Sequence, residues 1–376
     1  MIWQDFTGRA AGSGFQEALD GGFQSEIFIL VKLGYIGLQR MNIRAVAKRA
    51  RVSTATVSRT INGSDKVSPK TAARVLRAVE DLNFYPDTNA RALGTGRSRL
   101  YGLIISDITN PFFPELVKAF EDIAVEHGQE VMIANTNYDP ARMESCVTRM
   151  LQRKVDGVAI MTSEMDDRLI EVFSRRHVPL VFMDAGVPGM GVSSVRIDYH
   201  AGVARAMDHL IELGHKRIAF ISGPLRLASA RTRFHAFTEV LERSRLKGNP
   251  DMIQEGNHRV DGGHAAMQRI LSSGAKPTAI LASNDLTAIG AMGAIYEHGL
   301  RVPEDISVIG FDDILLSAFT RPALTTLRLP RGEIATAAFR ALFQSREAGA
   351  TKPGPGAEYL IQPDLVVRKS TGPAPR

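Results

Sequence analysis

The stretch from Asn42 to Ile61 has a pattern that fits two short helices joined by a tight turn. Apolar residues recur at the spacing of one helical face at Ile43, Val46, Ala47 and Ala50. The Asn42 side chain is suited to cap the first helix and that of Ser53 the second. Two helices connected so closely predict a helix-turn-helix.

A third helix is expected directly after this pair. Ser68 is suited to its N-cap and Pro69 to its first helical position. Its expected buried stripe consists of Val75, Leu76, Val79 and Leu82. Three such helices can enclose a small core. Asp87 then caps a short segment that Gly94 ends, and this segment has too few residues to be a stable helix alone in water.

Charge separates this region from the rest of the chain. From Met41 to Arg99 there are 12 Lys and Arg against 4 Asp and Glu, a net charge of +8, whereas the whole chain carries +6. The remaining residues therefore sum to −2. A basic segment on a nearly neutral body is typical of a nucleic-acid contact, and the second helix of a helix-turn-helix enters the DNA major groove. Charge alone would fit a solvated surface equally well.

These residues also resemble the DNA-binding headpiece of the lactose-repressor (LacI/GalR) family. The matching motifs are Val52-Ser53-x-x-Thr56-Val57-Ser58-Arg59, Asn62-Gly63, Val67-Ser68 and Leu82-Asn83-Phe84-x-Pro86-x-x-x-Ala90-x-x-Leu93. The resemblance implies that the DNA contacts come from Thr54, Ala55, Thr56, Arg59, Asn62, Ala90 and Leu93. It makes Leu93 a wedge in the minor groove and Ala90 its small neighbour in a hinge helix. For Thr54 and Ala55 the alternative is a helix start without DNA contacts. For Leu93 the alternative is an ordinary apolar residue of the linker.

From Leu100 onward, apolar strands alternate with helices. Leu100–Ile105, Glu130–Ala134, Gly157–Met161 and Leu180–Met183 alternate with helices at 113–127, 141–153 and 167–177. The alternation restarts with strands at 217–221, 279–282 and 307–310 and helices at 200–213, 229–243, 262–272 and 285–298. This order predicts two lobes with parallel, doubly wound sheets. Ligands of such sheets bind beyond the carboxyl ends of the strands, so the cleft between the lobes is the expected site.

The body resembles the effector-binding core of the same family, which is similar to periplasmic sugar-binding proteins. The matching motifs are Asp107 to Phe113, Lys154 to Gly157, Leu213 to Ala219, Gly223-Pro224, Asn284-Asp285, Asp305 to Asp313 and Pro322 to Thr326. The resemblance implies discontinuous lobes, with crossings near Ile197 and Thr326 and a third after Ala341. The family's tetramer-forming C-terminal heptads are missing, so a dimer is expected.

Effector contacts are also implied by the resemblance. The expected cleft residues are Asp107, Asn110, Phe112, Phe113, Asp184, Ser229, Arg231, Arg233, His258, Asn284 and Asp312. Carboxylates, amides and guanidinium groups suit a small polyhydroxylated ligand, and an aromatic face stacks on a sugar ring or base. Two positions depart from relatives: His258 replaces a stacking Trp or Phe, and Ala185 stands where the purine-binding relative has Trp. The two phenylalanines would equally suit core packing, and Arg231 an inter-lobe salt bridge.

Several other classes receive little support. Cys146 is the only cysteine, which excludes an internal disulfide and a cysteine zinc site and fits a reducing cytoplasm. No stretch approaches the roughly 20 apolar residues that span a membrane. Gly94-x-Gly96 does not continue into a dinucleotide fingerprint, and the histidines have no metal-protease spacing. We therefore expect no metal, no cofactor and no enzyme activity.

The sequence as a whole predicts an α + α/β protein. Residues 1–40 are expected to be a disordered arm or a mis-called start, 41–86 the helix-turn-helix headpiece, 87–99 the hinge helix and linker, and 100–376 the two-lobed periplasmic-binding-protein-like core. The expected function is a cytoplasmic, dimeric transcription regulator, most simply a repressor. It would bind a pseudo-palindromic operator under allosteric control by a sugar or related metabolite. The alternatives are a periplasmic-type sugar-binding protein and a Rossmann-type enzyme.

Replacing Arg59 by Ala tests whether this side chain reads bases. A bidentate contact with guanine contributes about 1–3 kcal/mol of discrimination. We expect Arg59→Ala to weaken binding to a selected operator while binding to random DNA, which depends mainly on phosphate charge, stays nearly the same. Gel shifts on both duplexes at several salt concentrations measure this, and an equal loss on both would contradict base reading.

Overall fold

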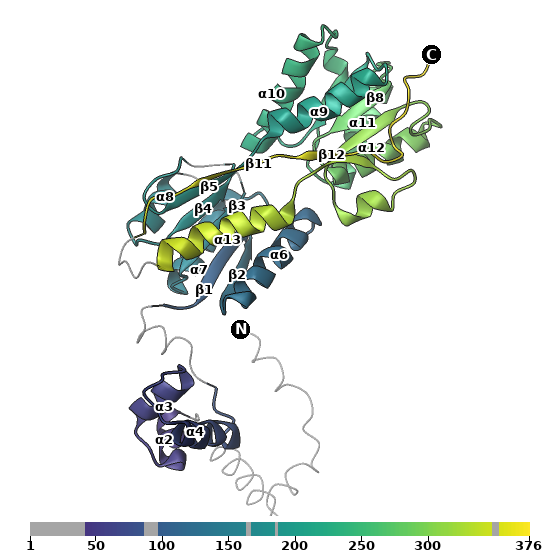
Figure 1. Ribbon diagram of the computed structural model, residues 1–376. Helices are drawn as coiled ribbons and strands as arrows, with labels where there is room; N and C mark the ends of the chain where they lie inside the picture. Colours follow the sequence, from purple (N-terminus) through teal and green to yellow (C-terminus); the bar gives the residue numbers. More distant parts are fainter. Residues whose placement is uncertain (1–41, 86–96, 163–166, 185–186, 348–352) are drawn as a thin grey trace, which may run out of the picture. The chain divides into compact units, whose positions relative to one another are not determined.

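The computed structural model describes residues 42–85, 97–162, 167–184, 187–347 and 353–376. These residues form two compact units, divided between Gly96 and Arg97. Figure 1 draws the helical unit in purple and the α/β unit in blue to yellow. None of the helices within these ranges is both long and apolar enough to cross a membrane.

The headpiece contains three helices, α2 (Ile43–Ala50), α3 (Thr54–Ile61) and α4 (Pro69–Asp81). The expected caps are present: Asn42 accepts from the backbone N–H of Ala45, Ser53 from that of Thr56 and Ser68 from that of Thr71. Each cap satisfies an N–H group that the helix itself leaves unpaired. The three helices bury one small core, which contains Val46, Ala47, Ala50, Val57, Val75, Ala78 and Phe84.

One residue of the expected stripe on the third helix was assigned wrongly. The Leu76 side chain is 54% exposed, whereas Val75 and Ala78 are buried and Val79 and Leu82 pack at the edge of the core. Positions 75, 78, 79 and 82 follow the i, i+3, i+4, i+7 spacing. Leu76 lies about one residue's rotation away from that face, so it points to solvent.

The first lobe of the larger unit is a six-stranded sheet in the order β11-β5-β4-β3-β1-β2, with every neighbouring pair parallel. Its strands are β1 (Leu100–Ile105), β2 (Glu130–Asn135), β3 (Gly157–Met161), β4 (Leu180–Met183), β5 (Val192–Ile197) and β11 (Glu358–Ile361). Helices α6 (Phe112–Glu126) and α13 (Arg331–Glu347) pack together on one face (Figure 1). Helices α7 (Pro140–Gln152) and α8 (Asp167–Ser174) cover the other.

The second lobe repeats this plan in the order β12-β10-β9-β8-β6-β7. Its strands are β6 (Ile218–Ser222), β7 (Ile253–Glu255), β8 (Ala279–Ala282), β9 (Ser307–Asp312), β10 (Thr325–Arg328) and β12 (Asp364–Val366), of which only β12 pairs antiparallel. Helices α9 (Tyr199–Glu212) and α10 (Ala228–Arg243) cover one face, and α11 (Val260–Ser272) and α12 (Asp285–Glu297) the other. Two short 3-10 helices, Pro250–Met252 and Leu315–Ala318, lie in its loops.

The chain passes between the lobes three times. It leaves β5 at Ile197 for α9, returns from β10 at Arg328 to α13, and crosses again between Ile361 of β11 and Asp364 of β12. The third crossing therefore lies well beyond the end of α13. The expected alternation lacked α13 and strands β5, β7, β10, β11 and β12. These strands have weak apolar runs, and the buried residues of α13 are spread around the helix.

Helices α11 and α12 pack so closely that no side chain fits at Gly290. A Cβ atom at Gly290 would lie 1.9 Å from the carbonyl oxygen of Val260, whereas one at Gly293 would meet only the His264 ring at 3.6 Å. We expect Gly290→Ala to lower the free energy of unfolding by about 1–3 kcal/mol through overpacking. The matched variant Gly293→Ala should stabilise by about 0.5–1 kcal/mol because alanine favours helix. Denaturant unfolding of both variants checks this, and equal effects would contradict the close contact.

Candidate functional site

The first candidate surface lies on helix α3 of the headpiece. Thr54, Ala55, Arg59 and Asn62 are exposed there, as a DNA contact requires. Thr56 is only half exposed, and its hydroxyl is 3.0 Å from that of Ser53, so it also serves the helix cap. Ala90 and Leu93, the expected hinge contacts, lie outside the described residues.

A groove of about 360 Å³ runs beside this surface. It is lined by Val52, Ser53, Thr56, Arg59, Lys66, Val67, Ser68, Thr71 and Arg74. Three of these side chains are cationic, and the capped N-termini of α3 and α4 meet at the groove. Positive side chains and helix N-termini both attract phosphate groups, so the groove suits a nucleic-acid backbone.

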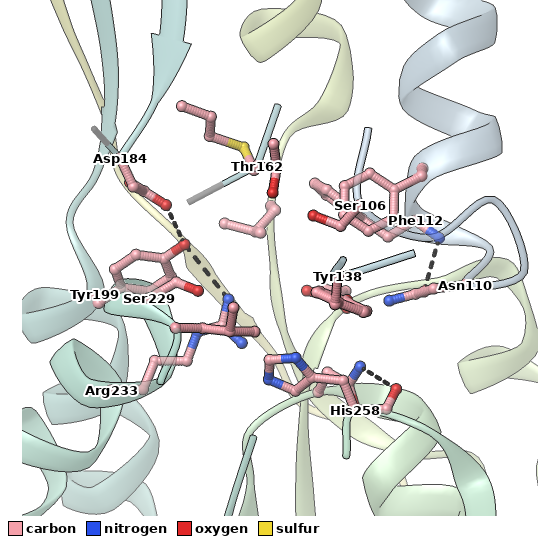
Figure 2. A pocket seen from close by; sticks show the side chains of 16 residues that line it. Ser106, Asn110, Phe112, Tyr138, Thr162, Asp184, Tyr199, Ser229, Arg233 and His258 are labelled. Carbon is pink, nitrogen blue, oxygen red and sulfur yellow. Dashed lines mark hydrogen bonds between the residues drawn. The ribbon is translucent and has the colours of Figure 1, made fainter. Parts of the chain in front are cut away.

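The second candidate site is a pocket lined by both lobes of the larger unit (Figure 2). Its lining residues are Ser106, Asn110, Phe112, Phe113, Tyr138, Thr162, Met183, Asp184, Tyr199, Leu227, Ser229, Arg233, His258, Asn284, Asp312 and Leu329. Several of these directly follow the carboxyl ends of parallel strands, where open α/β sheets bind ligands. Nine of the eleven expected effector residues line this pocket.

Arg233 of helix α10 is the only arginine among the described residues that line the pocket, and it is 7% exposed. Its guanidinium group lies 4.7 Å from the centre of the Tyr199 ring and 4.5 Å from that of Phe311. It donates to the carbonyl oxygen of Ser283 at 2.5 Å and to the Tyr199 hydroxyl at 3.4 Å. The Nε atom has no hydrogen-bond partner among the described residues, so it keeps a donor for a ligand or water.

Asp184 brings a carboxyl group from the first lobe to this arginine. Its Oδ1 accepts from the backbone N–H of Ile197 at 2.8 Å, and its Oδ2 accepts from the Tyr199 hydroxyl, which also contacts Arg233 (Figure 2). Burial raises the pKa of Asp184 from 3.8 to about 6, against the opposing effect of these hydrogen bonds and of Arg233. A chain of three polar groups thus joins the lobes along one side of the pocket.

Asp312 provides the second carboxyl group, at the end of strand β9. Its backbone φ of 115° is one that residues other than glycine rarely adopt, and the next residue, Asp313, has a φ of 56°. Such conformations cost on the order of 1–3 kcal/mol each and occur often at ligand sites. Burial raises the pKa of Asp312 to about 8, and repulsion from Asp285 adds to this, while Arg233 opposes it.

His258 occupies the floor of the pocket, with a φ of 63°. Its ring lies against Gly223, where a Cβ atom would come within 1.8 Å of Nε2, and its centre is 6.2 Å from that of Tyr138. Burial, followed by the charges of Arg233 and Arg226, lowers the pKa of His258 to about 3. The imidazole is therefore neutral at pH 7, and its Nε2 has no partner in the described chain.

Two expected effector residues are not on the pocket wall. Asp107 pairs with Arg259 of the second lobe, whose Nη2 is 2.8 Å from Oδ2 and also contacts Asn137. Arg231 donates to the carbonyl oxygens of Leu225 and Arg226 at 2.9 and 2.7 Å. Both side chains turn to nearby partners that the sequence pattern did not reveal. The salt bridge between the lobes is made by Arg259, and none is seen for Arg231 among the described residues.

The pocket also contains residues that the sequence analysis missed: Ser106, Tyr138, Thr162, Met183, Tyr199, Leu227 and Leu329. Ser106 and Thr162 follow the ends of β1 and β3, and Met183 ends β4, so the rule for parallel strands could have found them. Tyr199 begins a helix just after a lobe crossing. Its role depends on the approach of the two lobes and has no sequence signal.

The geometry defines a class: a small helix-turn-helix unit followed by a two-lobed α/β core with a polar pocket between the lobes. Comparisons with known proteins agree. Residues 42–87 match the model for bacterial regulatory proteins of the lacI family, and residues 207–371 match that for a periplasmic binding protein-like domain. The HTH-type transcriptional repressor PurR of Histophilus somni is 34% identical over 330 residues, 87% of this chain and 98% of its own.

Two solved structures extend this likeness. The lac repressor dimer bound to operator and the anti-inducer ONPF has a TM-score of 0.77 and 31% identity, covering 89% of this chain and all of that one. The complex of the transcriptional regulator CelR with cellobiose has a TM-score of 0.65 and 29% identity, covering 88% and 100%. The chain belongs to the LacI family, and it is a DNA-binding transcriptional regulator.

The buried carboxyl group of Asp312 predicts a pH dependence of stability. Its pKa in the folded protein is raised from 3.8, so its contribution to stability is complete below pH 3.8 and is lost as the pH rises through about 8. The side chain of Asp312→Asn cannot ionise. Between pH 3.8 and about 8, the free energy of unfolding of this variant should therefore fall less steeply than that of wild type, by up to about 1.4 kcal/mol per pH unit. Urea unfolding at several pH values measures this. The control is Asp208→Asn, which changes an exposed carboxylate that pairs with Arg243. If the free energies of unfolding of Asp312→Asn and wild type change with pH in parallel, the prediction is wrong.

Proposed function

We propose that this regulator represses transcription as a homodimer that binds a pseudo-palindromic operator and is controlled by a sugar or sugar derivative. The observation that carries the proposal is the pocket between the lobes, whose wall combines Arg233, Asp184 and Asp312 with aromatic and amide side chains. Membership in a family of DNA-binding regulators favours this function over a periplasmic sugar-binding protein or a Rossmann-type enzyme.

The headpiece supports the DNA-binding part of the proposal. Exposed side chains of α3 reach base edges when a recognition helix enters the major groove. We assign this role to Thr54, Ala55, Arg59 and Asn62, with Thr56 also holding the helix cap. Two such headpieces in a dimer would read two half-sites, and the similar lac repressor was solved as a dimer bound to operator. Ala90 and Leu93 remain predictions for the hinge.

The pocket chemistry supports a polyhydroxylated ligand. Asp184 and Asp312 accept hydrogen bonds, Arg233 and Asn110 donate them, and Ser229 does both. Phe112 and Phe113 provide an apolar side for a ring face, with their own ring centres 5.2 Å apart. Similar proteins are described with cellobiose and with ribose. The PurR relatives raise a purine as the competing ligand, but Ala185 stands where the purine-binding relative has tryptophan.

The size of the cavity connects ligand binding to regulation. Its volume is about 50 Å³, space for only a few water molecules at roughly 10–15 Å³ each. A sugar ring needs more room, so we expect the lobes to separate or the side chains to rearrange when the effector enters. A ligand that favours one lobe arrangement shifts the population toward it, and effector and operator then alter each other's affinity by the same factor.

A screen of ligands and operators tests this function. The operator is selected in vitro from random duplexes, and thermal shifts are measured with monosaccharides, cellobiose, sugar phosphates, hypoxanthine and guanine. We expect at least one sugar to raise Tm and to change operator affinity. Asp312→Ala and Arg233→Ala should each weaken binding of that sugar by roughly 10–100-fold, because each removes a buried polar group that hydrogen-bonds the ligand.

The controls separate a pocket effect from a general one. Asp208→Ala removes an exposed carboxylate of the same lobe and should leave sugar binding unchanged. All three variants should still bind the selected operator in preference to random DNA when no ligand is present, because the headpiece is unchanged. A Tm shift with a purine and none with any sugar would show that the effector is a purine and not a sugar. If the protein selects no duplex, the proposed function as a DNA-binding regulator is wrong.

A further inference from the structure

The turn that follows strand β9 has an unusual backbone and an unusual set of partners. Asp312 and Asp313 both have positive φ, 115° and 56°, although neither is glycine. A strained turn persists only where the surrounding groups determine it strongly. Because Asp312 lines the pocket, whatever holds this turn also positions a proposed effector-binding carboxyl group.

Two side chains of the first lobe hold the backbone of this turn. Arg331 donates from Nη1 to the carbonyl oxygen of Asp312 at 2.7 Å and from Nη2 to that of Asp313 at 3.0 Å. Its Nε is 2.8 Å from Oε2 of Glu115, whose Oε1 accepts from the backbone N–H of Leu315 at 3.3 Å. We call this pair the Arg331–Glu115 clamp.

The clamp joins the two lobes. Glu115 lies in the first turn of α6 and Arg331 is the first residue of α13, and these two helices pack together on the sheet of the first lobe. The turn that they hold belongs to the second lobe. The two side chains are only 32% and 19% exposed, so their bonds are shielded from water and stronger than those of a surface pair.

Two other arginines bind the same turn from the second lobe itself. Arg328 of β10 places Nε 2.7 Å from Oδ2 of Asp313, and Arg368 places Nη2 2.6 Å from Oδ1. Both bonds hold the Asp313 side chain to strands and loops of its own lobe. Of these three arginines, Arg331 is the one that belongs to the first lobe, so comparing Arg331 with Arg328 isolates its contact between the lobes.

We infer that Arg331 and Glu115 are positioning residues that fasten the first lobe to the turn carrying Asp312, and thereby transmit occupancy of the pocket to the first lobe. A ligand that draws the Asp312 carboxyl group also rotates its peptide unit, whose oxygen lies in the fork of Arg331. The transmitted signal rests on the proposed function, because Asp312 must contact the effector. The fastening of the two lobes by Arg331 and Glu115 does not depend on the proposed function.

The fastening is measured by the distance between spin labels in the full chain without ligand. Glu144→Cys on α7 and Glu242→Cys on α10 place one label on each lobe at exposed positions. Cys146 is the only native cysteine and is buried, so the two new thiols are the ones that react. Labelled chain is diluted into unlabelled chain so that only distances within one chain are recorded.

Arg331→Met should broaden the distance distribution and shift its maximum away from that of wild type. Arg328→Met is the matched control, since it removes a guanidinium group from the same turn without touching the first lobe, and it should keep the wild-type distribution. An unchanged distribution in Arg331→Met overturns the inference. An equal change in both variants does so as well, because the effect would then come from the turn alone.

Glu115→Gln provides a second variant in case Arg331→Met does not fold. Its amide oxygen still accepts from Leu315, but the charge that pairs with Arg331 is gone, so we expect a smaller broadening in the same direction. Arg331→Lys keeps the charge without the fork and should recover only part of the wild-type distribution. If Glu115→Gln matches wild type, the clamp does not hold the lobes. The distances are measured without ligand. If no sugar raises Tm in the screen, that result therefore counts only against the proposed function.

Discussion

A guanidinium group enclosed between the two lobes is the interaction on which the core depends. Arg233 is buried against the rings of Tyr199 and Phe311, within reach of carboxyl groups on both lobes. A buried charge without partners costs several kcal/mol, so the cation requires the Asp184 carboxylate, and polar groups such as the Asp312 carboxyl, to remain near it. Asp184 belongs to the first lobe, and the other two belong to the second. Neutralising this charge therefore favours one arrangement of the lobes.

The same groups that hold the lobes also form the proposed ligand site. The Tyr199 hydroxyl is shared between Asp184 and Arg233, and Asn110 from the first lobe donates to Asp312 of the second. A ligand in this pocket must replace some of these bonds, and the lobes lose the contacts that it replaces. Binding and lobe geometry are thus coupled by the same hydrogen bonds, as allostery requires.

Bonds at the edges of the pocket add to this coupling. Arg259 crosses from the second lobe to Asp107 and Asn137 at one side, and the Arg331–Glu115 clamp holds the Asp312 turn at another. The strained φ angles of Asp312 and Asp313 are maintained by bonds to both the backbone and the side chains of the turn. These contacts between the lobes are polar and can be exchanged, in contrast to the apolar faces of the sheets that helices cover.

Local features were predictable because they depend on neighbours in the sequence. The caps at Asn42, Ser53 and Ser68 follow from residue type and spacing, and they are present. The main strands follow from apolar runs that are covered by helices on both faces. Edge strands such as β11 and β12 have three or four residues and exposed side chains, so their pairing depends on the finished sheet. Leu76 shows the same limit within a helix, since its exposure depends on which face the other two helices cover.

The sequence alone determined the headpiece, the alternation of strands and helices, and most of the residues on the pocket wall, because these follow from short-range periodicity and from motifs shared with a family. Only the tertiary structure decided which polar groups meet. The pairs Asp107 with Arg259, Tyr199 with Asp184, and Arg331 with the Asp312 turn join residues far apart along the chain. Charged side chains have several partners within reach in any folded protein, and the approach of the two lobes selects among them.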